Sequence, residues 1–257
     1  MIEQKYVDEF IKTIKRGRFK SGNEIYARNY CDLSECERAE ICYDAVYEGY
    51  LDAARTFNGN GLKGDNKYFR ELSQKIQEYL DGDDSTFEHE ELCKPLMENN
   101  KMTYGQAQKI VNMAFKYLYC IPHSTTDNRV ELRFAKCHMP IDGVMLEWIY
   151  REVKPEMKKS KIGKWSRMSY SDDDEGNGYY SYKFYKDAIN DYCQEKQKTP
   201  LQLDFENWGK MSFILSSEKF YNAIKDCNLN IYDGLKEESI KNIHNIINNI
   251  YDRTNIR

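Results

Sequence analysis

The chain has 257 residues, of which 40% are hydrophobic and only five are prolines, and its formal net charge is −4 at pH 7. This composition is that of a soluble globular protein, and the length suits one large domain or two closely associated halves. The net acidity argues against a protein that coats nucleic acid without discrimination, although it leaves room for a local basic face.

No apolar run approaches the ~18 residues that a membrane-spanning helix needs, so we expect no membrane association. The first stretch, Met1 to Lys20, is charged throughout rather than signal-like, which points to the cytoplasm. The eight cysteines are therefore expected to be reduced thiols and not a disulfide framework.

One group of possible metal ligands flanks a single loop: Cys120, His123, Cys137 and His138. Together they could supply four zinc ligands. Neighbouring residues such as Cys137 and His138 seldom bind one ion together, so buried thiols are the preferred interpretation. We expect no metal and no other cofactor.

Apolar residues recur at helical spacing along most of the chain, beginning with Tyr6 and Phe10, and few segments alternate with a period of two. This pattern predicts an all-α fold, with at most a short strand at Phe134 or at 211–215. In chain order, helices are expected over residues 6–14, 36–57, 68–80, 85–96, 103–120, 142–153, 180–196, 201–210, 217–227 and 235–253.

Clusters of glycine and polar residues separate these helices. Residues 16–18 end the first helix and residues 58–61 end the second. Ser85 with Glu88 forms a capping-box pattern at the start of the fourth. The acidic, glycine-containing stretch at 171–178 is expected to be a solvated loop and the main internal break.

Two basic stretches offset the acidic total. Residues 12–20 contain five Lys or Arg and no acid, and residues 151–167 contain seven against two glutamates, with Trp165 among them. Cations for phosphate contact and an aromatic ring for base stacking are what a nucleic-acid surface requires. A solvated surface is the alternative interpretation. The candidate DNA contacts in the second stretch are Lys158, Lys159, Lys161, Lys164 and Trp165.

The stretch from Tyr104 to Trp148 is the most informative part of the chain. Within it, Gly105 to Lys109 reads Gly-Gln-Ala-Gln-Lys and opens an apolar helix, and Pro140-Ile141-Asp142 opens the next. Cations are disfavoured at a helix N-terminus, so we expect a depressed pKa for Lys109 and more of the neutral amine that can attack carbon. Asp142 is expected to cap its helix.

These two motifs resemble those of the helix-hairpin-helix DNA glycosylases, and most closely the archaeal-type 8-oxoguanine DNA glycosylases. In that superfamily a Gly-x-Gly-x-Lys turn leads into an apolar helix, and a Pro-Val-Asp or Pro-Ile-Asp element follows. In this chain Ala107 stands where the second glycine of the turn would be, and the segment between lysine and aspartate is long, as in the archaeal type.

The resemblance implies an all-α fold with two helical halves flanking a cleft, a helix-hairpin-helix core at about 85–155 and a C-terminal half at about 179–257, within a single domain over 1–257. It implies that Lys109 is an amine nucleophile that attacks the sugar C1′, while Asp142 stabilises the oxocarbenium-like charge.

The implied partner is double-stranded DNA with a flipped, oxidised or otherwise modified base, bound by a monomer. The turn before Lys109, with Gly105, Gln106 and Gln108, would contact the DNA, because backbone N–H groups at such a turn can receive a phosphate. Strand cleavage after base excision and a role in defence against phage DNA are both compatible with these residues.

Three alternatives remain at this stage. Lys116, two helical turns beyond Lys109, is a rival nucleophile. A non-enzymatic helical module that binds nucleic acid or a protein is the second function considered. In the third, Lys109 and Asp142 form a plain surface ion pair, which is worth less than about 1 kcal/mol. Convergence of the two side chains in a cleft would favour the enzyme, and opposite orientations would exclude it.

Overall fold

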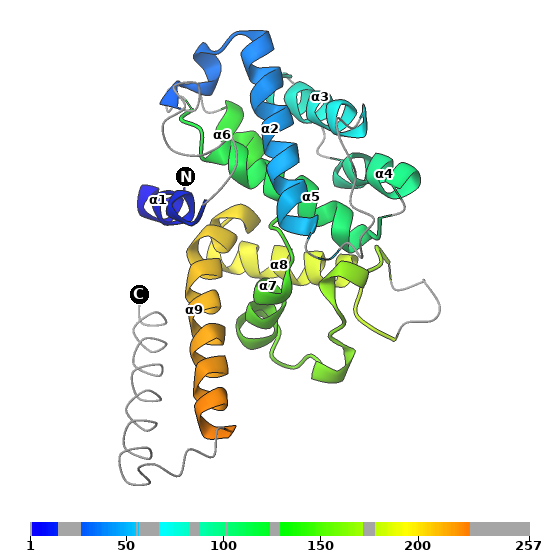
Figure 1. Ribbon diagram of the computed structural model, residues 1–257, viewed down its shortest axis with the longest axis vertical. Coiled ribbons are helices and arrows are strands. Elements are labelled where there is room, and N and C mark those ends of the chain that lie inside the picture. Colours follow the sequence, from blue (N-terminus) through cyan, green and yellow to red (C-terminus); the bar gives the residue numbers. More distant parts are fainter. Residues whose placement is uncertain are drawn as a thin grey trace. The chain divides into compact units, whose positions relative to one another are not determined.

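The computed structural model describes residues 2–14, 27–54, 56, 67–82, 88–100, 102–123, 129–171 and 178–226 (Figure 1). These residues contain helices and no strand, which confirms the expected all-α class. The chain forms two compact units, residues 1–206 and 207–257. This division does not coincide with the break that the sequence suggested at 171–178.

Several expectations concern residues outside these ranges. They are the helix end at 16–18 with most of the basic stretch 12–20, the turn at 58–61, Ser85 of the capping-box pattern, the acidic residues 172–176 and the helix at 235–253.

The α-helices are α1 (Gln4–Thr13), α2 (Glu35–Ala54), α3 (Lys67–Asp81), α4 (His89–Asn100), α5 (Tyr104–Tyr119), α6 (Arg129–Phe134), α7 (Gly143–Trp148), α8 (Tyr182–Lys196) and α9 (Pro200–Asp226). Short 3-10 turns are η2 (Tyr30–Asp32), η4 (Lys159–Lys161) and η5 (Trp165–Arg167), and η3 (Ile149–Val153) is a π-helical turn.

The prediction of a short strand at Phe134 or at 211–215 was wrong in both places. Phe134 is the last residue of α6, and residues 211–215 lie in the middle of α9, which joins the two helices expected at 201–210 and 217–227. A short apolar run has no periodicity that distinguishes a strand from a buried helical segment. Thr199 and Gln202 begin α9 with reciprocal hydrogen bonds of 3.3 and 2.8 Å, so this helix start is well defined.

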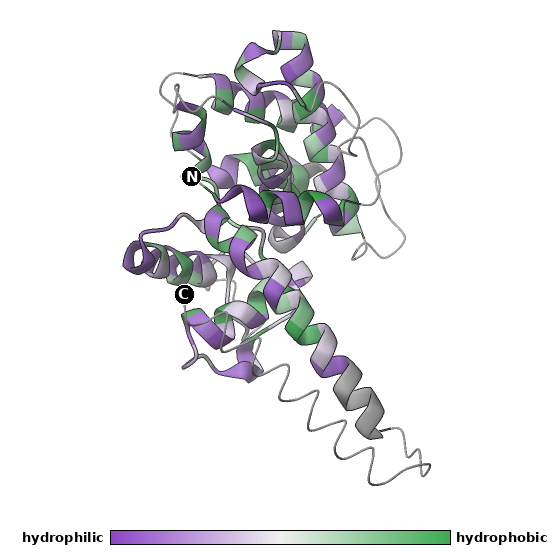
Figure 2. Ribbon diagram, turned by 90° about the vertical axis from the view of Figure 1, so that its left-hand side faces the viewer, coloured by the Kyte–Doolittle hydropathy of each residue, from purple (hydrophilic) through white to green (hydrophobic). Residues whose placement is uncertain are grey.

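Helix α5 is the centre of the first unit. Every residue of α5 except Gln106 is buried, and the helix packs against α2, α4 and η5. A β-carbon on Gly49 of α2 would lie 2.5 Å from the Ile110 carbonyl oxygen, so α2 and α5 approach with their backbones nearly touching. Figure 2 shows hydrophilic and hydrophobic residues interspersed along the helices, as expected of amphipathic helices.

Two caps fix the helix starts that matter for the site. Thr103 Oγ1 accepts a hydrogen bond from the Gln106 N–H, and the Gln106 side chain accepts one from the Thr103 N–H, both at 3.2 Å. This capping box places Gly105 inside the first turn of α5. Asp142 caps α7, which continues into the π-helical turn η3, so the helix expected over 142–153 is confirmed.

None of the helices described here is both long and apolar enough to span a membrane.

Candidate functional site

The side chains of Lys109 and Asp142 meet. Lys109 Nζ lies 2.8 Å from Asp142 Oδ2, and the two side chains are only 8% and 14% exposed. The lysine comes from the second turn of α5 and the aspartate from the residue that caps α7, so two helix starts 33 residues apart build the pair. The orientation to opposite faces, which would have excluded the enzyme, does not occur.

Each carboxylate oxygen of Asp142 has its own partner. Oδ1 accepts hydrogen bonds from the backbone N–H groups of Val144 and Met145, both at 3.0 Å, while Oδ2 faces Lys109. The cap therefore fixes the orientation of the carboxylate. An asparagine at this position could keep the cap while removing the negative charge.

The expected depression of the Lys109 pKa is wrong. Burial does disfavour the charged amine, but the negative charge and hydrogen bond of Asp142 outweigh it, with smaller contributions from Asp52 and Asp204, so the pKa is raised above its usual value. A carboxylate in direct contact exceeds the effect of the helix N-terminus, because the helix charge is only partial and more diffuse. The amine is consequently protonated in the free protein.

Gln108 connects α5 to the residue before Asp142. Its Nε2 donates to the Ile141 carbonyl at 2.7 Å and to the Gly105 carbonyl at 3.0 Å, and its Oε1 accepts from the Ile141 N–H at 3.2 Å. Gln108 is fully buried. The expectation that it contacts DNA is therefore wrong, because its polar atoms hold the chain and do not reach the surface.

A buried polar cluster continues from Gln108. Asn112 Nδ2 donates to Gln108 Oε1 and to the Met139 carbonyl, both at 3.0 Å, and Asn112 Oδ1 lies 2.8 Å from His89 Nε2. His138 Nδ1 lies 2.9 Å from the Tyr182 hydroxyl. Burial lowers the pKa of both histidines, that of His138 to about 3, so both are neutral near pH 7.

The arrangement of these histidines bears on the zinc alternative. His123 lies against Glu131 at 2.9 Å, whereas His138 belongs to the Tyr182 cluster. Cys137 is fully buried, and burial raises its pKa well above the usual value, which disfavours the thiolate that would bind zinc. Over the described part of the chain, no three His, Cys, Asp or Glu side chains converge as a metal site requires.

Lys116, the rival nucleophile, belongs to a second ion pair that is almost completely buried. Its Nζ lies 2.5 Å from Asp204 Oδ2, with side-chain exposures of 3% and 0%. The same amine lies over the rings of Phe10 and Phe205, 4.3 and 4.9 Å from their centroids. Burial raises the pKa of Asp204. No sequence pattern pointed to this pair, since Asp204 stands between the apolar residues Leu203 and Phe205.

The turn before Lys109 is covered by the chain itself. The Gly105 N–H donates to the Met168 carbonyl at 3.0 Å, and Thr103 Oγ1 donates to the Ser166 carbonyl at 2.7 Å. A β-carbon on Gly105 would lie 1.8 Å from the Trp165 carbonyl oxygen. The backbone N–H that we expected to receive a phosphate is therefore already used, and the basic stretch occupies the space beside it.

A cavity of about 680 Å³ lies beside this contact. Gln106, Gly143, Lys164, Trp165 and Arg167 are among the residues that line it. The structure thus brings together three of the residues that the sequence assigned to DNA, namely Gln106, Lys164 and Trp165. Lys109 and Asp142 are not in the cavity wall, but Gly143 follows Asp142 directly and Gln106 is one helical turn before Lys109.

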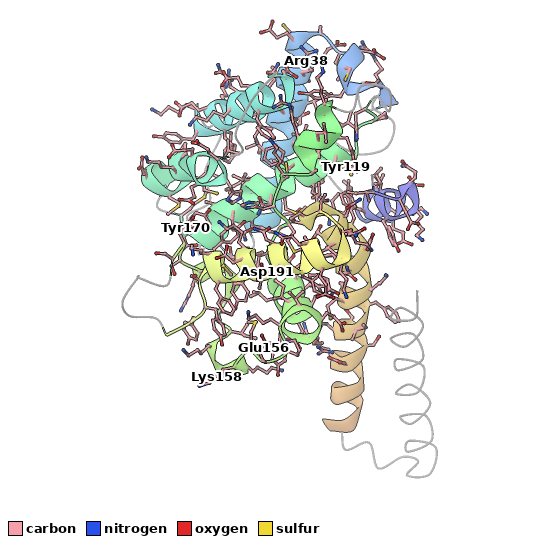
Figure 3. The ribbon with its side chains drawn as sticks, turned by 180° about the vertical axis from the view of Figure 1, so that it is seen from behind. Arg38, Tyr119, Glu156, Lys158, Tyr170 and Asp191 are labelled. Carbon is pink, nitrogen blue, oxygen red and sulfur yellow. The ribbon has the colours of Figure 1, made fainter. Side chains whose placement is uncertain are left out.

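The other predicted basic contacts lie outside the cavity. Lys158, Lys159 and Lys161 are exposed, and Lys158 lies at the outer edge of the ribbon (Figure 3). Lys159 Nζ is 4.0 Å from Glu147 Oε1, and Lys161 Nζ is 5.9 Å from the centre of the Tyr180 ring. They form a cationic border that could contact a backbone of phosphates.

Taken together, the site contains a buried amine, a fixed carboxylate and a neighbouring cavity with a cationic rim. An amine in contact with a carboxylate can lose a proton to it and become a nucleophile. Comparison with protein-family models, with curated proteins and with solved structures finds no match to this chain.

Proposed function

We propose that this protein is a DNA glycosylase of the helix-hairpin-helix type, which excises an oxidised or otherwise modified base through Lys109. The observation that carries the proposal is the buried contact between Lys109 and Asp142. The sequence resemblance assigns a catalytic pair to these two residues, and the 2.8 Å distance between them supports that assignment.

In this mechanism the Lys109 ammonium first loses a proton, and Asp142 Oδ2 is close enough to accept it. The free electron pair of the amine then attacks C1′ of the deoxyribose. The bond between C1′ and the base breaks, and the base leaves with that electron pair and takes up the proton held by Asp142 as it departs, which restores the carboxylate. A proton then passes from the adduct nitrogen to the ring oxygen O4′ and the bond between C1′ and O4′ breaks, which leaves a protonated imine.

Asp142 has a second role, because positive charge develops on the sugar as the base departs. Its carboxylate cannot turn away without losing the cap on α7, so the charge stays next to the reacting carbon. Water then hydrolyses the imine, or elimination of the 3′ phosphate cuts the strand.

The test uses duplexes that carry 8-oxoguanine and a small panel of other modified bases, including modified bases of phage DNA. Borohydride reduces an imine to a stable amine, so an enzyme that forms one becomes covalently linked to DNA. We expect trapping on at least one duplex, and the reactive duplex identifies the substrate class, whether a repair lesion or a phage modification.

Two lysines on the same helix provide the matched comparison. Lys109→Gln should abolish trapping, whereas Lys116→Met, which removes the other buried amine, should leave a trapped complex. Trapping that survives in Lys109→Gln and disappears in Lys116→Met would overturn the assignment of the nucleophile. Circular dichroism of both variants separates loss of chemistry from loss of fold.

A non-enzymatic nucleic-acid-binding module is the second candidate. The raised pKa of Lys109 favours it, because a charged lysine is not a nucleophile. DNA binding without trapping or base release on any duplex of the panel would support this candidate over the glycosylase.

A further inference from the structure

The cavity between α5, α7 and the basic stretch has a fixed position. One wall is η5 with the residues around it, and this wall is held to α5 by the hydrogen bonds of Gly105 and Thr103 described above. Gln106 supplies part of the α5 side, and Leu146 and Glu147 supply the α7 side. A volume of about 680 Å³ is within the usual range for small-ligand sites, roughly 300–1,000 Å³.

The rim of this cavity attracts anions. Lys164 and Arg167 line it, both are exposed, and neither forms an ion pair with any described carboxylate. Among the described residues of the wall, Glu147 is the one acid, and its charge is offset by Arg151 at 2.8 Å and Lys159 at 4.0 Å. Two unpaired cations side by side are suited to the oxygens of a phosphate.

An aromatic ring completes the wall. Trp165 is half-buried, and its Cδ1 lies 3.9 Å from the point where a β-carbon on Gly143 would be. Because Gly143 has no side chain, no β-carbon of α7 packs against this edge of the indole. A flat aromatic surface next to phosphate-binding cations is the arrangement by which proteins hold an unstacked base.

We propose that this cavity binds one unpaired nucleotide of the DNA strand, with its phosphate at Lys164 and Arg167 and its base against Trp165. This nucleotide is not the one that reacts, because neither Lys109 nor Asp142 lines the cavity. The inference rests on the proposed function for the identity of the partner as DNA. It adds a second subsite, next to the reacting one.

The position of the cavity fits a neighbouring nucleotide. Gln106 precedes Lys109 by three residues on α5, a rise of about 4.5 Å along the helix axis, and Gly143 is the residue after Asp142. The cavity therefore borders both of the elements that carry the Lys109–Asp142 pair. The subsite would hold the strand open beside the flipped base, and would replace the phosphate contact that Gly105 cannot make.

The experiment measures binding of unmodified DNA by fluorescence anisotropy, so it does not depend on catalysis. The two probes are a labelled duplex with one unpaired, bulged nucleotide and the fully paired duplex of the same sequence. We expect the bulged duplex to bind at least fivefold more tightly to the unaltered protein. Trp165→Leu should remove this advantage, since stacking of one base is worth a factor of about five or more, and Trp165→Phe should keep most of it.

Charge is tested separately in the double variant Lys164→Gln/Arg167→Gln. Loss of two phosphate contacts should weaken binding of the bulged duplex about tenfold or more and reduce the slope of log Kd against log salt by about 1.8. The matched control is Lys183→Gln/Lys196→Gln, which removes two exposed lysines of α8 that do not line the cavity. This control should change the affinity much less.

Three results would overturn the proposal. They are equal binding of bulged and paired duplexes, an advantage for the bulge that survives Trp165→Leu, and a double variant no weaker than its α8 control. Efficient competition by free thymidine monophosphate would show a small nucleotide, and not a strand, as the ligand. Imine trapping at Lys109 tests the proposed function alone, so the two can fail independently.

Discussion

The side-chain amide of Gln108 is bonded to both peptide groups of Ile141, with Nε2 2.7 Å from its carbonyl oxygen and Oε1 3.2 Å from its nitrogen. Gln108 precedes Lys109 and Ile141 precedes Asp142, so this contact sets the distance between the two candidate catalytic residues. Gln108 does not touch the reacting atoms in the proposed mechanism and is a positioning residue. Its effect on the reaction would pass through the location of Asp142.

Replacing Gln108 by leucine should therefore harm both stability and chemistry. The change removes the Gln108 partner from the buried N–H and carbonyl groups of Ile141, at a cost of about 1–3 kcal/mol for each group left unsatisfied. We expect the free energy of unfolding in urea to fall by about 2–4 kcal/mol. Gln106→Leu is the matched control, because Gln106 is partly exposed and bonds only to its own helix cap and, at 3.4 Å, to Thr56 Oγ1, and it should lose about 1 kcal/mol or less. Equal losses in the two variants would contradict the role of Gln108.

The pH dependence of base excision should reveal the charge state of Lys109. Because its pKa is raised above the usual 10.5, the neutral fraction increases about tenfold for each pH unit up to that value. The single-turnover rate constant should accordingly rise from pH 6 to pH 9 without a plateau. In Asp142→Asn the maximum rate should fall, and the curve should level off at lower pH because the main source of the raised pKa is gone. Identical curve shapes for the two proteins would show that Asp142 does not control the amine.

Replacement by alanine should destabilise the protein at Gly105 but not at Gly143, the two glycines near Trp165. A β-carbon on Gly105 would lie 1.8 Å from the Trp165 carbonyl oxygen, so the basic stretch must move, and we expect a loss of at least about 2 kcal/mol despite the better helix propensity of alanine. The same substitution at Gly143 places its β-carbon in ordinary contact with the Trp165 ring, 3.9 Å away, and should be tolerated. Thermal unfolding of both variants measures the difference, and a stable Gly105→Ala protein would show that this wall is movable.

Two histidines should give opposite contributions to acid stability. The pKa of His138 is lowered to about 3, so the unfolded chain takes up the proton first, and stability falls below about pH 6.5 by at most about 1.4 kcal/mol per pH unit. The pKa of His123 is raised, because hydrogen bonds and the charge of Glu131 outweigh its burial. The stability that His123 contributes is therefore present below about pH 6.5 and is lost as the pH rises through the pKa of His123 in the folded protein.

Unfolding free energies at pH 5.5 and pH 7.5 check these signs. Relative to the unaltered protein, His138→Gln should reduce the loss of stability on acidification, and His123→Gln should increase it. A larger loss on acidification in His138→Gln than in the unaltered protein would show that His138 is not buried in its neutral form.

The sequence identified the pair at the centre of the site because both members stand at helix starts, where short-range signals are strong. Asp142 was expected to cap its helix and does so, because a cap is a local feature that can be recognised without the rest of the fold. The helical class followed from the 3.6-residue spacing, whereas the apolar run at 211–215 was ambiguous because it has no spacing to read.

Long-range contacts explain what could not be predicted. Gly105 was expected to face a phosphate, yet its N–H bonds to Met168, a residue more than sixty positions later. Gln108 was expected to contact DNA as part of the turn before Lys109, but its partner is the Ile141 backbone. The shift of the Lys109 pKa was predicted in the wrong direction. The distance to Asp142 decides that direction, and no sequence pattern gives this distance.

The all-round burial of α5 has a consequence for the way in which a substrate reaches Lys109. A helix that has no solvent-facing side cannot fray or open by itself, and its amide hydrogens should exchange with solvent only when the whole first unit unfolds. The Lys109 amine is thus on a helix that resists local unfolding, and we expect that its surroundings do not rearrange to admit an intact duplex. Under the proposed function the DNA would have to change shape instead, so the energy of distortion would fall on the nucleic acid and bases that are already weakly paired would gain an advantage.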